Sequence, residues 1–362
     1  MIRLTTRRAR VLAITGVVVL ALAACGGSDK VATKRHRAPA TTTTTKPIPT
    51  APLTGLPDPL NVANARSSLA VKIENTPEAR PQSGLDVADV VFEEVVEGGI
   101  TRFWAIFNSA APENVGPIRS VRAMDPNVVT PFGGVVAYSG GTDPNVALIR
   151  AAPVTWVDEN NAGAAYFREP TRPAPHNLYG HTALLFQRGG QPVPPVPQYH
   201  YLGKGEAFTG EPVAQFHVNF QQGYDVTYAW DATRQGWLRF QRTNEPFLAV
   251  GSTPATVQVA PTNVVVQFVT YSGAGEGSLN GSGQVWVFSN GQLIRGTWAR
   301  AFPGAATSFT DANGAPIRFS PGRTWVELFP SGGTVDVVPG APQATTTTST
   351  TTAKPAAKKK KK

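Results

Sequence analysis

Cysteine is almost absent from this chain, because Cys25 is the only one among its 362 residues. A single thiol cannot form an intramolecular disulfide, so burial alone has to stabilise the fold. If Cys25 is used as a lipid attachment point, as argued below, thiol catalysis and thiolate metal sites are excluded as well.

Several motifs of catalysis and metal binding are missing too. The sequence has no His-x-x-x-His pair, no Asp-rich calcium loop, no phosphate-cradling Gly-x-x-x-x-Gly-Lys and no Gly-x-Ser-x-Gly. A metal site would have to be assembled from scattered carboxylates. We therefore expect no resident cofactor, and a divalent cation enters only under the enzymatic alternative given below.

The N-terminal residues are typical of a lipoprotein signal peptide. Four arginines precede an apolar stretch at residues 11–24, which is shorter than the ~20 residues of a membrane-spanning helix. The stretch ends in Leu22-Ala23-Ala24-Cys25, in which small residues precede the thiol that would receive diacylglycerol. Two acyl chains suffice for stable anchoring. We predict a signal peptide at 1–24 and a protein anchored through Cys25 on the outer face of the cytoplasmic membrane. An ordinary signal peptide with an incidental cysteine, or a signal anchor, is the alternative.

The net positive charge of the chain comes from its two ends. The net charge is +9, yet residues 51–340 hold 18 Lys+Arg and 23 Asp+Glu, a net charge of −5. Nucleic-acid binding through a basic face is therefore poorly supported. Both ends are Thr-rich and low in complexity, which predicts a disordered Thr/Pro tether at 25–51 and a disordered Thr/Lys tail at 341–362.

Between these ends the pattern predicts an α+β protein of two domains. Residues 52–190 read as a mixed α/β domain, residues 191–200 as a Pro-rich connection and residues 201–340 as a β-rich domain. In the second domain Asn290-Gly291 predicts a hairpin turn. We expect Trp286, Trp298 and Trp325 to share one core.

The expected elements follow from apolar patterning. In the first domain we expect strands at 69–74, 89–96, 101–108 and 135–138, the middle two as a hairpin, and helices at 143–151 and 181–187. In the second domain we expect strands at 215–220, 226–230, 236–242, 264–271, 284–288, 292–300 and 324–329.

Arginines of the first domain are the candidate functional residues, because several lie in loops stiffened by Gly and Pro. A guanidinium offers a planar fork that matches phosphate or carboxylate. The candidate ligand-binding residues are Arg102, Arg119, Arg122, Arg168, Arg172, His176 and Asn177, and the candidate supporting acids are Glu93, Glu97 and Asp125. If the loops converge, these residues form an anion pocket. The alternative is that each arginine forms an ion pair that pins its own loop.

The order of motifs resembles the YerB-like family of bacterial lipoproteins. The matching stretches lie at 79–85, 88–93, 97–103, 116–122 and 174–178, and in the second half at 290–298 and 322–326. This resemblance covers nearly all of residues 52–338. It implies a two-part lipoprotein of the cell envelope whose biochemical role is unassigned, so it supports topology and location but no mechanism.

A second likeness concerns enzymes. The order of Pro117-Ile118-Arg119-Ser120 and then Tyr138-Ser139-Gly140-Gly141 before a helix is similar to that in LytR-CpsA-Psr wall-polymer transferases. It implies arginines that hold a polyprenyl pyrophosphate. The chain departs from that family, since it has no Arg-Ser-Asp-Thr motif and Ser120 stands where an acid would follow the arginine.

We therefore expect a binding or scaffolding lipoprotein of the cell envelope, whose partner is an anionic wall polymer or an envelope protein. The alternative is a phosphotransferase or hydrolase acting on a lipid-pyrophosphate-linked wall polymer. In that case Arg119 and Arg122 clamp the pyrophosphate and His176 or Asp125 is the base. A third reading is purely structural, with the β-rich half docking on a membrane-complex partner.

Replacement of Cys25 by Ser should abolish lipid attachment, because a hydroxyl does not compete with a thiol in the alkylation. Cells expressing the full-length protein are labelled with an alkyne fatty acid, and the purified protein is tested for label. We expect label on the wild type and on a Thr43→Ala control, and none on Cys25→Ser. Equal labelling of the three proteins would refute the anchor.

Overall fold

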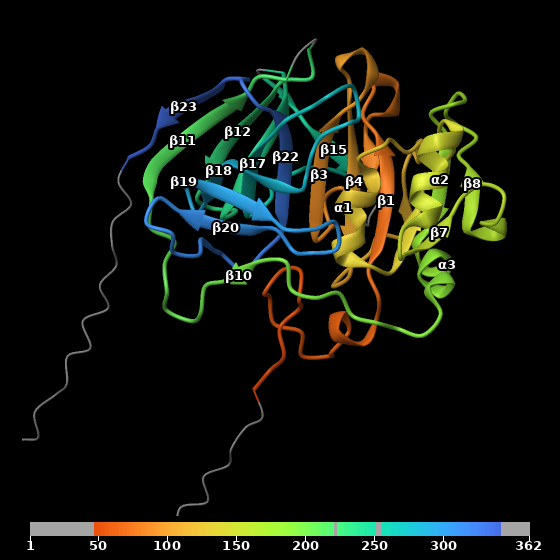
Figure 1. The fold of residues 1–362 in the computed structure, drawn as a ribbon, viewed down its shortest axis with the longest axis horizontal. Helices are drawn as coiled ribbons and strands as arrows, with labels where there is room; N and C mark the ends of the chain where they lie inside the picture. The colour runs from red at the N-terminus through yellow and green to blue at the C-terminus, as the bar shows by residue number, and fades with distance from the viewer. Residues whose placement is uncertain (1–46, 221–222, 243, 251–254, 342–362) are drawn as a thin grey trace, which may run out of the picture. The chain divides into compact units, whose positions relative to one another are not determined.

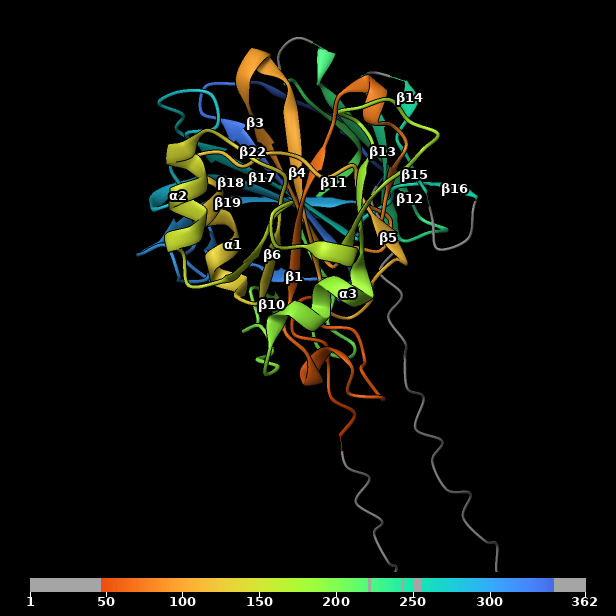
Figure 2. The same ribbon diagram turned by 90° about the vertical axis from the view of Figure 1, so that its right-hand side faces the viewer.

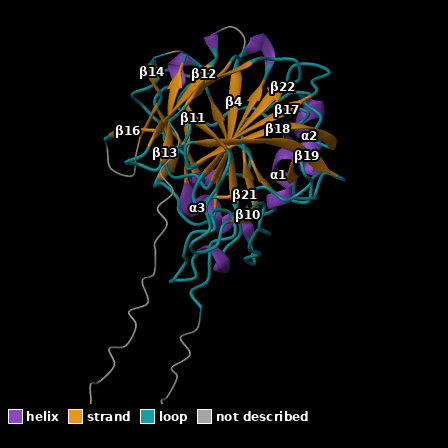
Figure 3. Ribbon diagram, turned by 90° about the vertical axis from the view of Figure 1, so that its left-hand side faces the viewer, coloured by secondary structure: helices purple, strands orange, loops and turns teal. Residues whose placement is uncertain are grey.

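The computed structural model describes residues 47–220, 223–242, 244–250 and 255–341. The predicted signal peptide, Cys25, and nearly all of the predicted tether and tail lie outside these residues. The described part is rich in strands and has few helices (Figure 3). Within it, no helix combines the length and the apolar character needed to cross a membrane.

The first half contains nine strands and three α-helices among the described residues. The strands are β1 (Leu69–Glu74), β2 (Gln82–Ser83), β3 (Val90–Val95), β4 (Thr101–Phe107), β5 (Asn114–Val115), β6 (Val135–Ala137), β7 (Thr155–Val157), β8 (Tyr166–Arg168) and β9 (Leu178–His181). The α-helices are α1 (Asp125–Val129), α2 (Asp143–Ala151) and α3 (Thr182–Phe186). Short 3₁₀ helices are η1 (Ala63–Ala65), η2 (Pro77–Ala79), η3 (Glu97–Gly99), η4 (Thr130–Phe132), η5 (Gly163–Ala165) and η6 (Gln187–Gly189).

Fourteen strands have their bounds described in the second half. They are β10 (His200–Tyr201), β11 (Glu211–Val218), β12 (Val226–Asp231), β13 (Gly236–Gln241), β14 (Glu245–Pro246), β15 (Leu248–Val250), β16 (Thr256–Gln258), β17 (Asn263–Val269), β18 (Gly281–Ser289), β19 (Gln292–Arg300), β20 (Ser308–Asp311), β21 (Arg318–Phe319), β22 (Thr324–Pro330) and β23 (Val335–Pro339).

One large sheet runs through both halves. Its strand order is β14-β13-β12-β11-β19-β18-β17-β22-β3-β4-β1-β6-β7. Strand β22 lies in the middle, parallel to both β17 and β3, so a late strand sits beside the first hairpin (Figure 1). The boundary that we predict at 191–200 stays a prediction, but the ranges on its two sides share this sheet and do not form separate sheets.

Most of the predicted elements are present. Strand β1 and helix α2 have the predicted bounds, and α2 has proline in its first turn, where its missing N–H costs nothing. The hairpin of β3 and β4 is antiparallel as expected. The turn between β18 and β19 has Asn290 and Gly291 at φ 48° and 65°, the left-handed pair that a tight hairpin needs.

Side-chain alternation gives the sheet two faces at β1, β3 and β4. Ala70 of β1 packs in the same cluster as Val128 of α1 and Ile149 of α2, and we call this side the α1 face. Val71 packs on the other side with Leu185 of α3, and we call it the α3 face. Figure 2 shows α1 and α2 on the same side of β4. Alternate residues of each strand therefore enter different cores.

The prediction of a shared tryptophan core is wrong. Trp298 packs on the α1 face, and Trp325 packs on the α3 face. Trp286 is partly buried against a third cluster, which contains Phe216 and Phe288 of the second half. The three strands lie in one sheet, but their tryptophans project from it into different layers.

The backbone conformation and a close neighbour require glycine at position 134. It has φ +69°, and a Cβ there would lie 2.2 Å from the carbonyl oxygen of Ser68. We expect Gly134→Ala to lower the free energy of unfolding by more than about 2 kcal/mol, since left-handed strain adds to a backbone collision. Gly98 has φ +71°, but a Cβ there would meet no atom within 4 Å, so Gly98→Ala isolates the strain and should cost about 1 kcal/mol. Equal losses in urea unfolding would contradict the collision.

Candidate functional site

A polar cluster occupies one end of the α1 face. The strand register pairs Glu74 of β1 with Arg102 of β4, and Arg102 with Glu94 of β3. Lys72 lies two residues before Glu74 and so projects from the same face. All four residues are buried, with at most 6% of their surface exposed. Burial of this many charges requires that each be paired or hydrogen-bonded.

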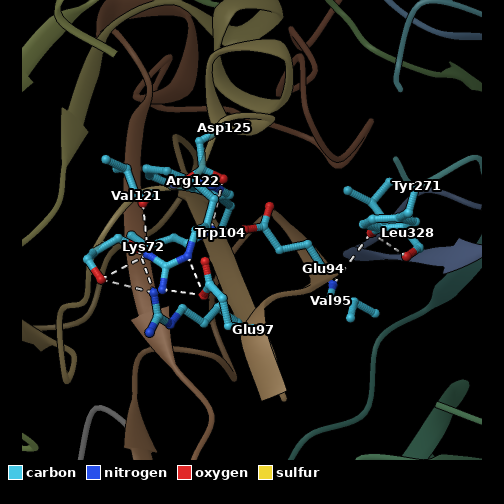
Figure 4. A network of polar contacts seen from close by, with 12 residues as sticks. Lys72, Glu94, Val95, Glu97, Trp104, Val121, Arg122, Asp125, Tyr271 and Leu328 are labelled. Atoms are coloured by element: carbon cyan, nitrogen blue, oxygen red, sulfur yellow. Dashed lines mark hydrogen bonds and ion pairs between the residues drawn. The ribbon is translucent and has the colours of Figure 1, made fainter. Parts of the chain in front are cut away.

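The innermost part of the cluster centres on Lys72 (Figure 4). Its Nζ lies 2.9 Å from Asp125 Oδ1 and also contacts Glu94. Asp125 opens helix α1 and accepts further hydrogen bonds from Trp104 Nε1, at 2.9 Å, and from the backbone N–H of Arg122, at 2.7 Å. The sharp turn before α1 is thereby tied to the sheet.

Glu94 shares one lysine with a second carboxylate. Burial is the main cause that raises its pKa to about 8, and the neighbouring Asp125 carboxylate raises it further. Lys72 acts in the opposite direction but is divided between the two acids. Near neutral pH, Glu94 therefore holds a proton.

Two of the predicted arginines meet at Ser120. Arg102 Nη1 donates to the Ser120 carbonyl oxygen at 2.9 Å and to its Oγ at 3.0 Å. Arg122 Nη1 donates to the same Oγ at 3.1 Å, and its Nη2 lies 2.6 Å from Glu97 Oε2. The side chain of Glu97 is 59% exposed, so this ion pair lies at the surface.

Arg102 is a buried cation without a carboxylate partner. No Asp or Glu of the described residues lies within 4.0 Å of its guanidinium, and its buried Nε has no hydrogen-bond acceptor. Its pKa is lowered to about 10, mainly by burial and then by repulsion from Arg122 and Arg119. Arg300 differs from Arg102 in this respect. It is equally buried, but its Nε, Nη1 and Nη2 all donate to neutral oxygens.

Arg119 and His176 meet on Glu74, so the structure brings these two predicted residues together, and Arg119 forms an ion pair there as the alternative describes. Arg119 Nε lies 3.3 Å from Glu74 Oε1, and His176 Nδ1 lies 3.0 Å from Glu74 Oε2. Thr76 Oγ1 also donates to Oε1, at 3.1 Å. Glu74 is almost fully buried, whereas a quarter of the Arg119 side chain is exposed. Arg119 therefore forms the solvent-facing side of the cluster.

Three other predicted residues lie at the end of β8 and in the loop between β8 and β9, and they do not contact Ser120 or Glu74. Arg168 Nη1 donates to Asn177 Oδ1 at 2.8 Å, and more than half of the Arg168 side chain is exposed. Arg172 donates to the carbonyl oxygens of Ala79, at 3.0 Å, and Pro81, at 2.7 Å. These contacts pin loops together through neutral acceptors, and of these two arginines Arg168 alone also forms an ion pair among the described residues, with Glu159 at 3.6 Å.

The three predicted acids divide between the two faces. Glu97 pairs with Arg122, and Asp125 accepts the backbone N–H of Arg122, so both support the cluster. Glu93 does not, because it precedes Glu94 in the strand and projects from the α3 face. There it lies 2.7 Å from Arg239 Nη2 and accepts from Thr101 Oγ1. Strand alternation is the reason for this correction.

Sequence reasoning missed Lys72, Glu74, Glu94 and Ser120. A signal for Lys72 was available, because it is one of two lysines in residues 51–340 and stands inside the apolar strand Leu69–Glu74. No comparable signal marks Ser120, whose role depends on two guanidinium groups from elsewhere in the chain. Among the described residues, no three His, Cys, Asp or Glu side chains are grouped so that they could hold a metal ion.

Glu94 predicts a pH-dependent stability. The folded protein keeps a proton on Glu94 up to a pH of about 8, whereas the unfolded chain loses it near 4.5. Stability from this group therefore falls as the pH rises between these values. Glu94→Gln has no proton to lose, so we expect it to unfold like the wild type at pH 5 and to be more stable at pH 8, by more than about 1.4 kcal/mol.

The check is urea unfolding of both proteins across this pH range. Glu113→Gln, at an exposed position, is the control and should follow the wild type. Parallel pH profiles of the wild type and Glu94→Gln would show that Glu94 is ionised throughout.

Comparisons with known proteins agree on one family. Residues 53–191 match a family profile described as "Protein of unknown function (DUF3048) N-terminal domain", and residues 216–326 match the corresponding C-terminal domain. "Putative lipoprotein YerB" of Bacillus subtilis (strain 168) is 26% identical over 292 residues, which are 77% of this chain and 86% of YerB. The crystal structure of YerB from Bacillus subtilis matches with a TM-score of 0.69 at 25% identity, over 80% of this chain and 99% of that chain. The resemblance read from the motifs is thus confirmed, and the chain belongs to the YerB-like family.

Proposed function

We propose that this protein is a lipid-anchored protein of the cell envelope that binds an anionic wall or lipid-linked component. The binding site is the cluster of Arg102, Arg119 and Arg122. The observation that carries the proposal is Arg102, a buried guanidinium with no carboxylate within reach in the described residues and two further arginines beside it.

An uncompensated buried cation favours the binding of an anion. Removal of a guanidinium from water is costly unless an opposite charge and hydrogen-bond acceptors replace the water. Phosphate and carboxylate oxygens supply both, and the planar fork of arginine suits them. The partly exposed side chain of Arg119 gives such an anion access from solvent.

Glu97 occupies the place on Arg122 that an external anion would take. Its carboxylate accepts from Arg122, whose side chain is only 13% exposed, while the Glu97 side chain is 59% exposed. An incoming anion would replace this carboxylate on Arg122. The exchange costs little, because exposed ion pairs contribute about 1 kcal/mol or less.

The proposed location rests on Cys25 and on the relative. YerB is described as a lipoprotein, and the sequence ahead of Cys25 has the pattern of a lipoprotein signal peptide. At the outer face of a membrane, the abundant anions are phosphate groups of wall polymers and of lipid-linked precursors. The enzymatic alternative stays a prediction, with His176 oriented by Glu74 as its candidate base.

The test is calorimetric titration of the full-length protein in detergent micelles with inorganic pyrophosphate. We expect Arg119→Ala to weaken binding by about tenfold or more, since a charge-assisted hydrogen bond contributes about 1.5–3 kcal/mol. Glu97→Gln should bind more tightly than the wild type, because the competing charge is gone and the shape is kept.

Arg234→Ala is the matched control, because this arginine is 54% exposed and lies in the turn after β12. It should bind like the wild type. If Arg119→Ala and Glu97→Gln both bind pyrophosphate as the wild type does, the cluster is not the site. Turnover of a polyprenyl-pyrophosphate substrate with Mg²⁺ would instead favour the enzymatic alternative.

A further inference from the structure

A second site for an anion is suggested by a pocket on the other side of the sheet. It has a volume of about 430 Å³, within the usual range for small-molecule sites. It lies between the 3₁₀ turn η2 and strands β13 to β15, and Arg80, Gln241, Arg242, Glu245 and Phe247 are among its lining residues. The remaining lining residues include three prolines, which give the pocket stiff apolar walls.

Arg80 enters the pocket as a positioned cation. Its Nη2 donates to the Asn75 carbonyl oxygen at 3.0 Å, and its Nε lies 3.3 Å from Asn75 Oδ1. No carboxylate of the described residues lies within 4.0 Å, and Nη1 donates to none of those residues. Burial and the nearby Arg239 guanidinium lower its pKa. Its positive charge is thus held in place but not neutralised.

The backbone on both sides of Arg80 is held by Arg172. The guanidinium of Arg172 donates to the carbonyl oxygens of Ala79 and Pro81, the two neighbours of Arg80 in the chain. Asn75 is itself held by its bond to Thr101 Oγ1, at 2.7 Å. Such support is what a preorganised binding residue needs.

Arg242 provides a second cation with an unusual backbone. Its φ is +55°, a region that residues other than glycine rarely adopt and that is common at functional sites. Its side chain is exposed and forms no ion pair with the described residues. Glu245 is the only acid that lines the pocket in the described part of the chain, so the two arginines give it a net positive charge.

The floor of the pocket is aromatic and rigid. Phe247 is buried and packs edge-on against Phe103 and Trp325, with ring centroids 5.8 and 6.2 Å apart. The guanidinium of Arg239 lies 4.0 Å from the centroid of the Phe247 ring. These contacts hold the Phe247 ring in place.

We infer that this pocket binds a small organic anion, with a phosphate or carboxylate group between Arg80 and Arg242 and a flat or apolar body against Phe247 and the prolines. The site is separate from the Ser120 cluster and does not depend on the function proposed for it. Arg172 is then a positioning residue for Arg80, which gives a role to a residue that the sequence placed among the ligand-binding arginines.

The test is titration of the full-length protein in detergent with phenyl phosphate, benzoate, inorganic phosphate and phenol, followed by ligand-observed NMR. We expect phenyl phosphate or benzoate to bind at least tenfold more tightly than inorganic phosphate or phenol. Only the first two probes carry both an anionic group and an aromatic ring. The preferred one of the two shows which anionic group the pocket takes.

Variants of the lining residues and of Arg172 test this site. Arg242→Ala, at an exposed position, should weaken binding at least tenfold, and Glu245→Gln should strengthen it. Arg172→Ala should weaken it in the wild-type Arg80 background but have no effect in Arg80→Ala, as expected of a residue that acts through Arg80. The exposed control Arg234→Ala should bind as the wild type does. Equal binding by Arg242→Ala, Glu245→Gln and the wild type would overturn the inference, as would equal affinity for the four probes.

Discussion

The parallel pairing of β22 with β3 is the interaction on which the rest of the structure depends. Residues 324–328 pair in register with residues 90–94, while β17 takes the other edge of β22. Strand β3 is thereby enclosed on both edges and both faces, and its two adjacent acids, Glu93 and Glu94, are both buried. Because they project to opposite sides, the sheet must neutralise a carboxyl group in each of its two cores.

The two cores meet this requirement with different cations. On the α3 face Glu93 accepts from Nη2 of Arg239, whose Nη1 donates to Gln241, and from Thr101 Oγ1. On the α1 face Glu94 shares Lys72 with Asp125, so one acid is left to hold a proton. The buried ion pairs need not add stability, since desolvation offsets much of their attraction. They do fix the positions of the loops that carry Ser120, Arg119 and Arg122.

Arginines tie segments of this fold together, and by our proposals some of them also bind anions. Arg172 and Arg300 donate to backbone carbonyl or hydroxyl oxygens and tie distant segments together. Arg102 and Arg80 keep a guanidinium nitrogen without an acceptor among the described residues. A rigid fork with a free donor is suited to an external anion, whereas a lysine would turn toward the nearest acceptor. The 16 arginines and two lysines of residues 51–340 are consistent with both purposes.

The sequence by itself determined the family, the strand-rich character and most of the longer elements, because these follow from local patterning, turn residues and short motifs. It also indicated Arg119, Arg122, His176 and the two acids near them. Only the tertiary structure decided which residues meet. The sheet register set Glu74 beside Arg102 and sent Glu93 to the other face, and it separated the three tryptophans into different cores. Glu74 and Arg102 are 28 positions apart and Val90 and Thr324 are 234 apart, and no local pattern encodes which distant strand becomes the neighbour.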